Sequence, residues 1–148
     1  MDGAGPLDPL PGTIALARPE ATAPDRDAWA AVRRGVLGLC PRCGEGRLFG
    51  RYLKVVPACP RCGQDLSGHR ADDGPAYLTI LLVGHLVGFA MHFTWTAFRP
   101  EPLVFALGTS AGAVALSLWL LPRVKGAIIG FQWARHMHGF GAGEAATD

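Results

Sequence analysis

The stretch CPRCGEGRLFGRYLKVVPACPRCG, residues 40–63, begins and ends with the same five residues, CPRCG. Its cysteines follow the spacing C-x2-C-x15-C-x2-C and are Cys40, Cys43, Cys59 and Cys62. Each CxxC pair can place two thiolates on one side of a metal ion, and two pairs complete the tetrahedral shell of structural zinc. Gly44 and Gly63 follow the pairs, where a tight turn often needs a positive φ. The pattern predicts a small zinc ribbon, mostly irregular and β, over residues 31–70, in which RYLKVV contributes a short strand.

Four thiolates fill the coordination shell, so the metal is expected to be structural rather than catalytic. Iron in a rubredoxin-like site uses the same four ligands, and it remains an alternative to zinc. Disulfides are disfavoured because they need an oxidising compartment, and a redox CxxC pair normally accompanies a βαβ pattern that this sequence lacks. The ribbon segment is poor in core residues, so its folding and its metal binding should be one event.

Two uncharged runs follow the cysteines. PAYLTILLVGHLVGFAMHFTWTAF covers residues 75–98, and PLVFALGTSAGAVALSLWLL covers residues 102–121. The first run has 24 residues, about 36 Å as a helix, which exceeds the roughly 30 Å of a hydrocarbon core. Only the three residues Arg99–Glu101 separate the runs. The sequence therefore predicts an antiparallel transmembrane helical hairpin over residues 71–121.

Lysine and arginine residues predict the orientation of this hairpin. The flanking basic residues are Arg61, Arg70, Arg123, Lys125 and Arg135, whereas the turn holds only Arg99. By the positive-inside rule, both termini and the ribbon are cytoplasmic. The basic stretch from Arg33 to Arg70 then faces an anionic leaflet, so lipid is favoured over nucleic acid as the partner of this charge.

The ends of the chain carry three further expectations. Residues 1–30 and residues 141–148 are predicted to be disordered tails, because the long N-terminal stretch shows no sustained apolar period. Pro122 should end or kink the second helix. Beyond it, residues 122–140 alternate apolar and basic side chains and predict a C-terminal amphipathic helix on the inner leaflet.

Each apolar run contains two glycines four residues apart. These glycines are Gly84, Gly88, Gly108 and Gly112. Small residues at this spacing allow close helix packing, so the two helices are expected to pack on each other, with a homodimer or a partner subunit as the alternative. His85 and His92 share one face beside this stripe and are candidate haem or copper ligands. Neutral rings bonded to a backbone carbonyl, a threonine or an interfacial water are favoured, because the second run has no His, Met or Cys.

The segment SGHRADDGPAY, residues 67–77, joins the ribbon to the first run. Asp72 and Asp73 are expected to cap the helix, which leaves no need for a catalytic role.

The sequence carries, in this order, RRGVLGLCPRCGEGRLF, the second CPRCG, LSGHRADDGPAYLTILLVGH and the hairpin. On these features the chain resembles a family of small bacterial membrane proteins known as domain of unknown function 983, over about residues 33–138. The resemblance implies no established activity. The genes of this family are often found beside those for cytochrome c oxidase and its assembly factors.

These features predict a non-enzymatic accessory protein of the bacterial inner membrane that docks on a membrane complex or assists its assembly. The resemblance suggests a respiratory cytochrome oxidase as that complex. A copper, haem or redox carrier and a membrane-tethered nucleic-acid or ribosome binder remain alternatives. An enzyme is not expected, because the metal shell is full and a ribbon with two helices offers little to enclose a substrate pocket.

Overall fold

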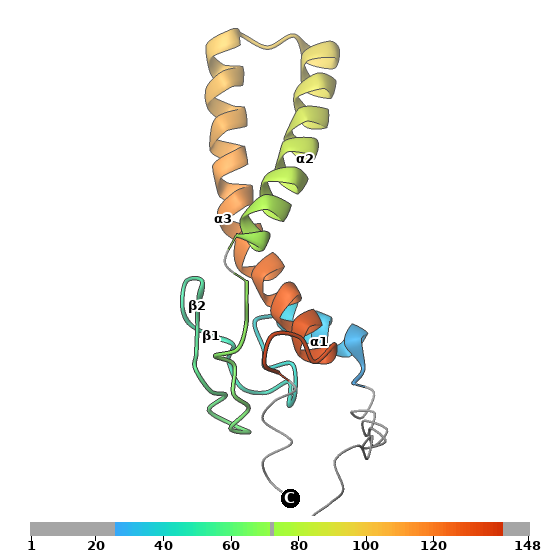
Figure 1. The fold of residues 1–148 in the computed structure, drawn as a ribbon. Helices are drawn as coiled ribbons and strands as arrows, with labels where there is room; N and C mark the ends of the chain where they lie inside the picture. The colour runs from blue at the N-terminus through green and yellow to red at the C-terminus, as the bar shows by residue number, and fades with distance from the viewer. Residues whose placement is uncertain (1–25, 72, 141–148) are drawn as a thin grey trace, which may run out of the picture.

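The computed structural model describes residues 26–71 and 73–140 of the 148-residue chain. Its elements in order are α1 (Ala28–Val36), β1 (Phe49–Arg51), β2 (Lys54–Val55), α2 (Gly74–Phe98) and α3 (Pro102–Ala134). Figure 1 shows α2 and α3 rising as a long hairpin from a small unit that holds α1, the two strands and the end of α3. We call this unit, residues 26–70 together with residues 122–140, the platform.

The two helices of the hairpin have the length and composition of membrane spans. α2 has 25 residues, α3 has 33, and both are apolar enough to cross a membrane. Only 11% and 0% of their most apolar windows are buried, unlike the core helix of a soluble protein. At the far end, Glu101 caps α3 by accepting a hydrogen bond from the Val104 N–H at 2.9 Å. Trp95 and Phe105 pack there with their ring centroids 5.6 Å apart.

The prediction of a separate C-terminal interfacial helix is wrong, because α3 continues without a break from Pro102 to Ala134. A proline has no N–H, so Pro122 deprives the Leu118 carbonyl of its helical donor. The hydroxyl of Tyr52, in the turn between β1 and β2, donates to that carbonyl at 2.8 Å. One residue further on, the Arg123 guanidinium donates to the Trp119 carbonyl at 2.6 Å. The helix can therefore pass through Pro122, since side chains serve the carbonyls that face the proline.

The third helix is N-terminal. Residues 28–30, expected to be part of a disordered tail, form the first turn of α1. The carboxylate of Asp27 caps this turn by accepting from the Ala30 N–H at 3.0 Å. Residues 1–25 and 141–148, the rest of the expected tails, lie outside the described residues.

α1 crosses the last third of α3 with the two backbones in contact. A Cβ on Gly35 would overlap the Gly126 carbonyl, and a Cβ on Gly126 would overlap the Gly35 carbonyl. One turn along, a Cβ on Gly130 would overlap the Ala31 carbonyl. Glycine is required at these positions because even a methyl group would separate the helices.

One hydrophobic core joins the parts of the platform. Leu48 and Leu66 from the cysteine-bearing loops are fully buried together with Ile129 of α3. Trp133 and Phe140 close the same cluster. The end of α3 therefore lies inside the platform rather than on its surface, which explains why its apolar side chains do not form an exposed amphipathic face.

Candidate metal centre

The two CPRCG repeats fold into two matching turns. The Gly44 N–H donates to the Cys40 carbonyl at 2.9 Å, and the Gly63 N–H donates to the Cys59 carbonyl at 3.0 Å. Both glycines have positive φ, 74° and 71°. The positive φ predicted for these two glycines is thus confirmed.

The four sulfur atoms lie in the geometry of a metal site. All four Sγ atoms are within 4.8 Å of one another. The Sγ distances between Cys40 and Cys62 and between Cys43 and Cys59 are both 3.8 Å. A tetrahedral ion with Zn–S bonds of about 2.3 Å requires sulfur atoms about 3.8 Å apart. The distances fit a bound metal such as zinc, and they are far too long for disulfide bonds of about 2.05 Å.

The cysteines differ in their surroundings, and these surroundings shift the pKa values of their thiols in different directions. The backbone N–H groups of Gly46 and Glu45 lower the pKa of the Cys43 thiol to about 6. Burial raises the pKa of Cys40 to about 12 and also raises the pKa of Cys62. A buried thiolate at Cys40 is therefore unfavourable by itself, and a cation bound among the four sulfur atoms supplies the charge that stabilises it.

Two residues that support the site were missed by the sequence analysis. A Cβ on Gly46 would overlap the Cys59 sulfur, so this glycine lets the two turns come together. Arg34 of α1 donates to the carbonyls of Pro41 and Arg42, both at 3.0 Å. The sequence analysis placed Arg34 only in a basic stretch, because nothing in a single sequence indicates that α1 packs beside the turn formed by the first CPRCG repeat.

A short antiparallel hairpin connects the two turns. Phe49 pairs with Val55 and Arg51 pairs with Lys54, with an irregularity between the pairs. Leu53 in the turn has a φ of 62°. The strand predicted for RYLKVV is therefore split, since its first residue belongs to β1 and its middle residues to the turn and β2. Figure 1 shows this hairpin rising beside α3, with its turn directed toward the long helices.

The linking segment is held by a side chain that the sequence analysis did not single out. The Gln132 amide accepts from the Arg70 N–H at 3.1 Å and donates to the Arg70 carbonyl at 2.8 Å. His69 makes a 2.7 Å ring-nitrogen contact with the Leu66 carbonyl. Asp73 stands at the N-cap of α2, but its carboxylate makes no capping bond among the described residues. Asp72 lies outside them.

The glycine pairs of the long helices do not join α2 to α3. A Cβ added to Gly84, Gly88, Gly108 or Gly112 would meet no described atom within 4 Å. α2 instead buries Pro75, Thr79 and Val83, all near the platform. The expected close packing inside the hairpin is therefore not observed, whereas packing against a second copy or a partner subunit stays a prediction.

The histidines of α2 face outward beside this stripe. His85 makes a 2.7 Å contact from Nδ1 to the Leu81 carbonyl, as the favoured backbone-bonded alternative predicts. Gly84, Gly88, His85, His92 and their apolar neighbours line an open groove of about 600 Å³. Among the described residues, the group of three or more potential His, Cys, Asp or Glu ligands is the four-cysteine cluster, which includes neither histidine. A ligand role for either histidine stays a prediction.

The fold and the cysteine geometry define a class of protein, namely a four-cysteine cluster with a small two-stranded sheet joined to two long apolar helices. A family model described as "Protein of unknown function (DUF983)" matches residues 49–133, more than half of the chain. The chain belongs to this family. The match includes the second cysteine pair and both long helices, whereas α1 and the first cysteine pair lie before it. No curated protein and no solved structure matches the chain.

Proposed function

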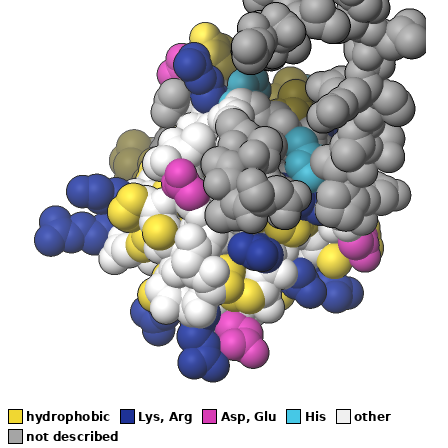
Figure 2. Space-filling model, turned by 60° about the horizontal axis from the view of Figure 1, so that its bottom comes forward, with side chains coloured by type: hydrophobic (Ala, Val, Ile, Leu, Met, Phe, Trp, Pro, Cys, Tyr) yellow, Lys and Arg dark blue, Asp and Glu magenta, His cyan; other side chains and the backbone are white. Residues whose placement is uncertain are grey.

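We propose that α2 and residues 102–121 of α3 cross a bacterial inner membrane, with the platform and both ends of the chain in the cytoplasm. The length and exposure of the two helices support this insertion. The orientation is supported by the distribution of charge, because basic residues are dense in the platform whereas the turn between the helices has only Arg99. Figure 2 shows several Lys and Arg side chains around the platform face that points away from the hairpin.

A labelling experiment tests the orientation. In intact cells, a membrane-impermeant maleimide should label Glu101→Cys in the turn but not Thr147→Cys in the tail. After lysis, both variants should react. The reverse pattern in intact cells would rule out the orientation, and equal labelling of both variants would rule out the insertion.

The proposed function is that of a non-enzymatic accessory protein that docks on another membrane protein through α2. The observation that carries this proposal is the open groove along the outward face of α2. Glycine in a helix costs up to about 1 kcal/mol relative to alanine, yet Gly84 and Gly88 touch nothing in the described chain. Small residues at this spacing serve to admit a second helix backbone. The occupant we propose is a transmembrane helix of a partner subunit.

The full cysteine shell argues against turnover chemistry. Four sulfur ligands leave no coordination position for a substrate. The groove on α2 is lined mainly by apolar side chains and two histidines, with no nucleophile or carboxylate among them. We therefore assign the metal, which we propose to be zinc, to holding the ribbon in shape.

Genetic complementation tests the docking proposal. A respiratory oxidase is the first partner to examine, since the sequence resemblance implies that association. Deleting the gene should lower the amount of assembled oxidase without changing its transcripts. The wild-type chain should restore assembly, and so should His85→Leu/His92→Leu, because leucine leaves the groove lined by apolar side chains and the proposal treats the histidines as non-ligands. Gly84→Leu/Gly88→Leu should fail, because large side chains fill the groove.

Two results would replace this proposal with one of its alternatives. If the double histidine variant is inserted and loaded with metal but cannot restore assembly, a haem or copper carrier is favoured. If the purified chain binds RNA with an affinity that falls steeply with salt, a nucleic-acid binder is favoured. If both double variants restore assembly equally, the groove is not the docking surface.

A further inference from the structure

The turn between β1 and β2 is fixed at the end of the apolar part of α3. Tyr52 donates to the Leu118 carbonyl at 2.8 Å, within the apolar run that ends before Pro122. The Leu118 carbonyl needs a donor from outside the helix backbone, because Pro122 has no N–H to offer it. If residues 102–121 lie in a membrane, as proposed above, this contact holds the turn at the membrane boundary.

Two cationic side chains flank this turn. Arg51 and Lys54 are direct partners across the antiparallel pair, and both are exposed. The one described ion pair joins Arg61 to Glu45, far from the turn. The charges of Arg51 and Lys54 are therefore not neutralised by a described acidic residue, and they point to an anionic partner from outside the platform.

Aromatic and basic side chains also lie on α3 next to the carbonyl that Tyr52 contacts. Trp119 is 54% exposed, and the Arg123 guanidinium stacks over its ring at 3.9 Å. Tyr52 itself is 57% exposed. Amphipathic rings beside cationic groups are typical of the headgroup layer of a membrane, where the ring body meets acyl chains and the polar atoms meet phosphate.

The anion must approach in the plane of the membrane, which decides between lipid and nucleic acid. The turn is directed along α3 toward its apolar run (Figure 1). A nucleic-acid duplex lies in the aqueous phase and would meet the sides and base of the platform first. A phospholipid headgroup lies at the depth of Arg51 and Lys54 and carries the phosphate that both side chains recognise.

We propose that the β1–β2 turn is a binding site for anionic phospholipid headgroups, in which Arg51 and Lys54 contact the phosphate while Tyr52 keeps the turn on α3. This site gives the metal ribbon a role at the membrane, because the ribbon presents the turn between its two cysteine pairs. The inference rests on the proposed membrane insertion of the helical hairpin.

The test uses the full chain in nanodiscs of phosphatidylcholine with a minor fraction of phosphatidylglycerol. Native mass spectrometry measures the ratio of the two lipids that stay bound. We expect enrichment of phosphatidylglycerol by the wild type and a loss of about thirtyfold in that preference for Arg51→Gln/Lys54→Gln, since each of the two basic residues contributes about 1 kcal/mol near an anionic surface.

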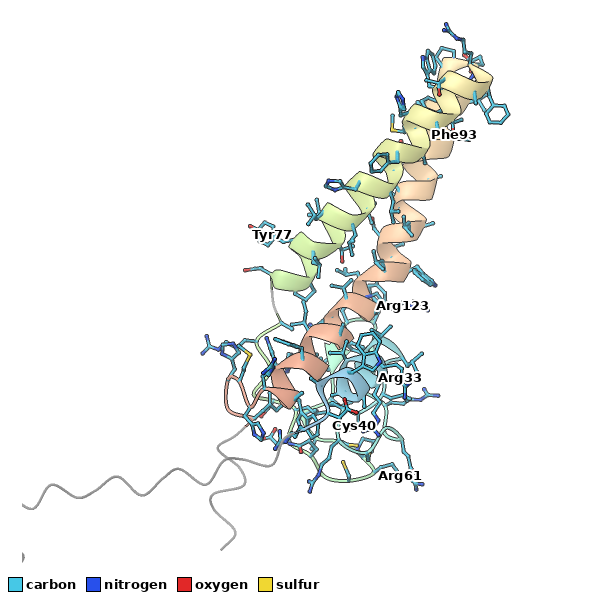
Figure 3. All side chains as sticks on the ribbon, turned by 90° about the vertical axis from the view of Figure 1, so that its right-hand side faces the viewer. Arg33, Cys40, Arg61, Tyr77, Phe93 and Arg123 are labelled. Atoms are coloured by element: carbon cyan, nitrogen blue, oxygen red, sulfur yellow. The ribbon has the colours of Figure 1, made fainter. Side chains whose placement is uncertain are left out.

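Arg61→Gln is the matched control. Arg61 belongs to the same ribbon and its side chain is 68% exposed, but Figure 3 places it at the end of the platform far from the long helices. The control should keep the wild-type lipid preference. All variants should keep one metal per chain, because none of the three side chains is among the four candidate ligands.

The possible outcomes separate this proposal from the membrane insertion on which it rests. Equal phosphatidylglycerol preference in the wild type and in Arg51→Gln/Lys54→Gln would overturn the lipid site. Displacement of the lipid by millimolar inorganic phosphate would make it a free-anion site and would also overturn it. Failure of the Glu101→Cys labelling pattern would instead overturn the orientation or insertion itself, whatever the lipid result.

Discussion

Two pairs of glycines with the same spacing behave differently in this molecule. Gly126 and Gly130 of α3 lie in the platform, where a Cβ on either would overlap the backbone of α1. Gly84 and Gly88 of α2 lie on the outward face of the hairpin, where a Cβ would meet nothing within 4 Å. One pair closes an interface inside the chain, and the other leaves a groove open. Two glycines four residues apart therefore predict the capacity for close helix packing, but they do not predict the partner.

The same contrast applies to the two regions as wholes. The platform has a shared core and a four-cysteine cluster with the geometry of a metal site. The hairpin leaves most of its apolar side chains exposed, so its surroundings must supply the contacts. Changes in the platform should therefore reduce stability, and changes on the outward face of the hairpin should affect association.

Removing one cysteine should have the largest effect and should be confined to the platform. Cys59→Ser leaves three sulfur ligands, so we expect the metal content to fall from one zinc per chain to near zero. Hydrogen exchange should rise over residues 40–66, while α2 stays protected in detergent. Finding iron in place of zinc would correct the metal, and a metal-free wild type with a folded ribbon would contradict the site.

The second prediction compares a glycine from each region. Gly126→Ala should lower the free energy of unfolding of the platform by about 2–3 kcal/mol, because α1 and α3 must move apart to admit the methyl group. Gly108→Ala should leave platform stability unchanged, since its Cβ meets open space. Hydrogen exchange of α1 in each variant provides the measurement. Equal protection in both variants would contradict the close crossing.

The interface that the sequence analysis missed shows why prediction fell short there. GAIIG at residues 126–130 has the same spacing as the glycine pairs of the apolar runs, so its signal was present. It was overlooked because Pro122 was expected to end or kink the helix, and because the α1 segment was divided between a disordered tail (residues 1–30) and the ribbon (residues 31–70), so no helix was expected there. Each error hid one side of the α1–α3 contact.

The metal centre was predictable for a different reason. Four cysteines with two following glycines specify a local geometry, and local geometry depends on few distant residues. The donor that serves the Leu118 carbonyl comes from Tyr52, 66 positions before Leu118 in the chain. Long-range contacts of this kind leave no periodic pattern, and the same holds for Gln132 with Arg70.

The third prediction concerns the link between the platform and α2. Gln132→Ala removes both hydrogen bonds to the Arg70 backbone, so the platform should lose about 1–2 kcal/mol of unfolding free energy. The Arg70 amide should exchange faster. Gln64→Ala is the control, because among the described residues the Gln64 side chain bonds only to the neighbouring Asp65 carbonyl. Unchanged exchange at Arg70 would show that water replaces the amide without loss.

The smallest expected effect lies at the junction of the two regions, where it tests why α3 continues through Pro122. Tyr52→Phe removes the hydroxyl that serves the Leu118 carbonyl, so the stability of the platform should fall by about 1 kcal/mol. Tyr77→Phe should be silent, because Tyr77 is 74% exposed and its hydroxyl makes no bond among the described residues.

A second substitution turns this small effect into a specific test. In Pro122→Ala, residue 122 gains an N–H that can donate to the Leu118 carbonyl as in any α-helix. The carbonyl then no longer needs Tyr52, so Tyr52→Phe should cost much less in the Pro122→Ala background than in the wild type. The double-mutant cycle should give a coupling energy of about 0.5–1 kcal/mol. A coupling energy of zero would mean that the tyrosine hydroxyl does not compensate for the proline, and another contact would have to explain the unbroken helix.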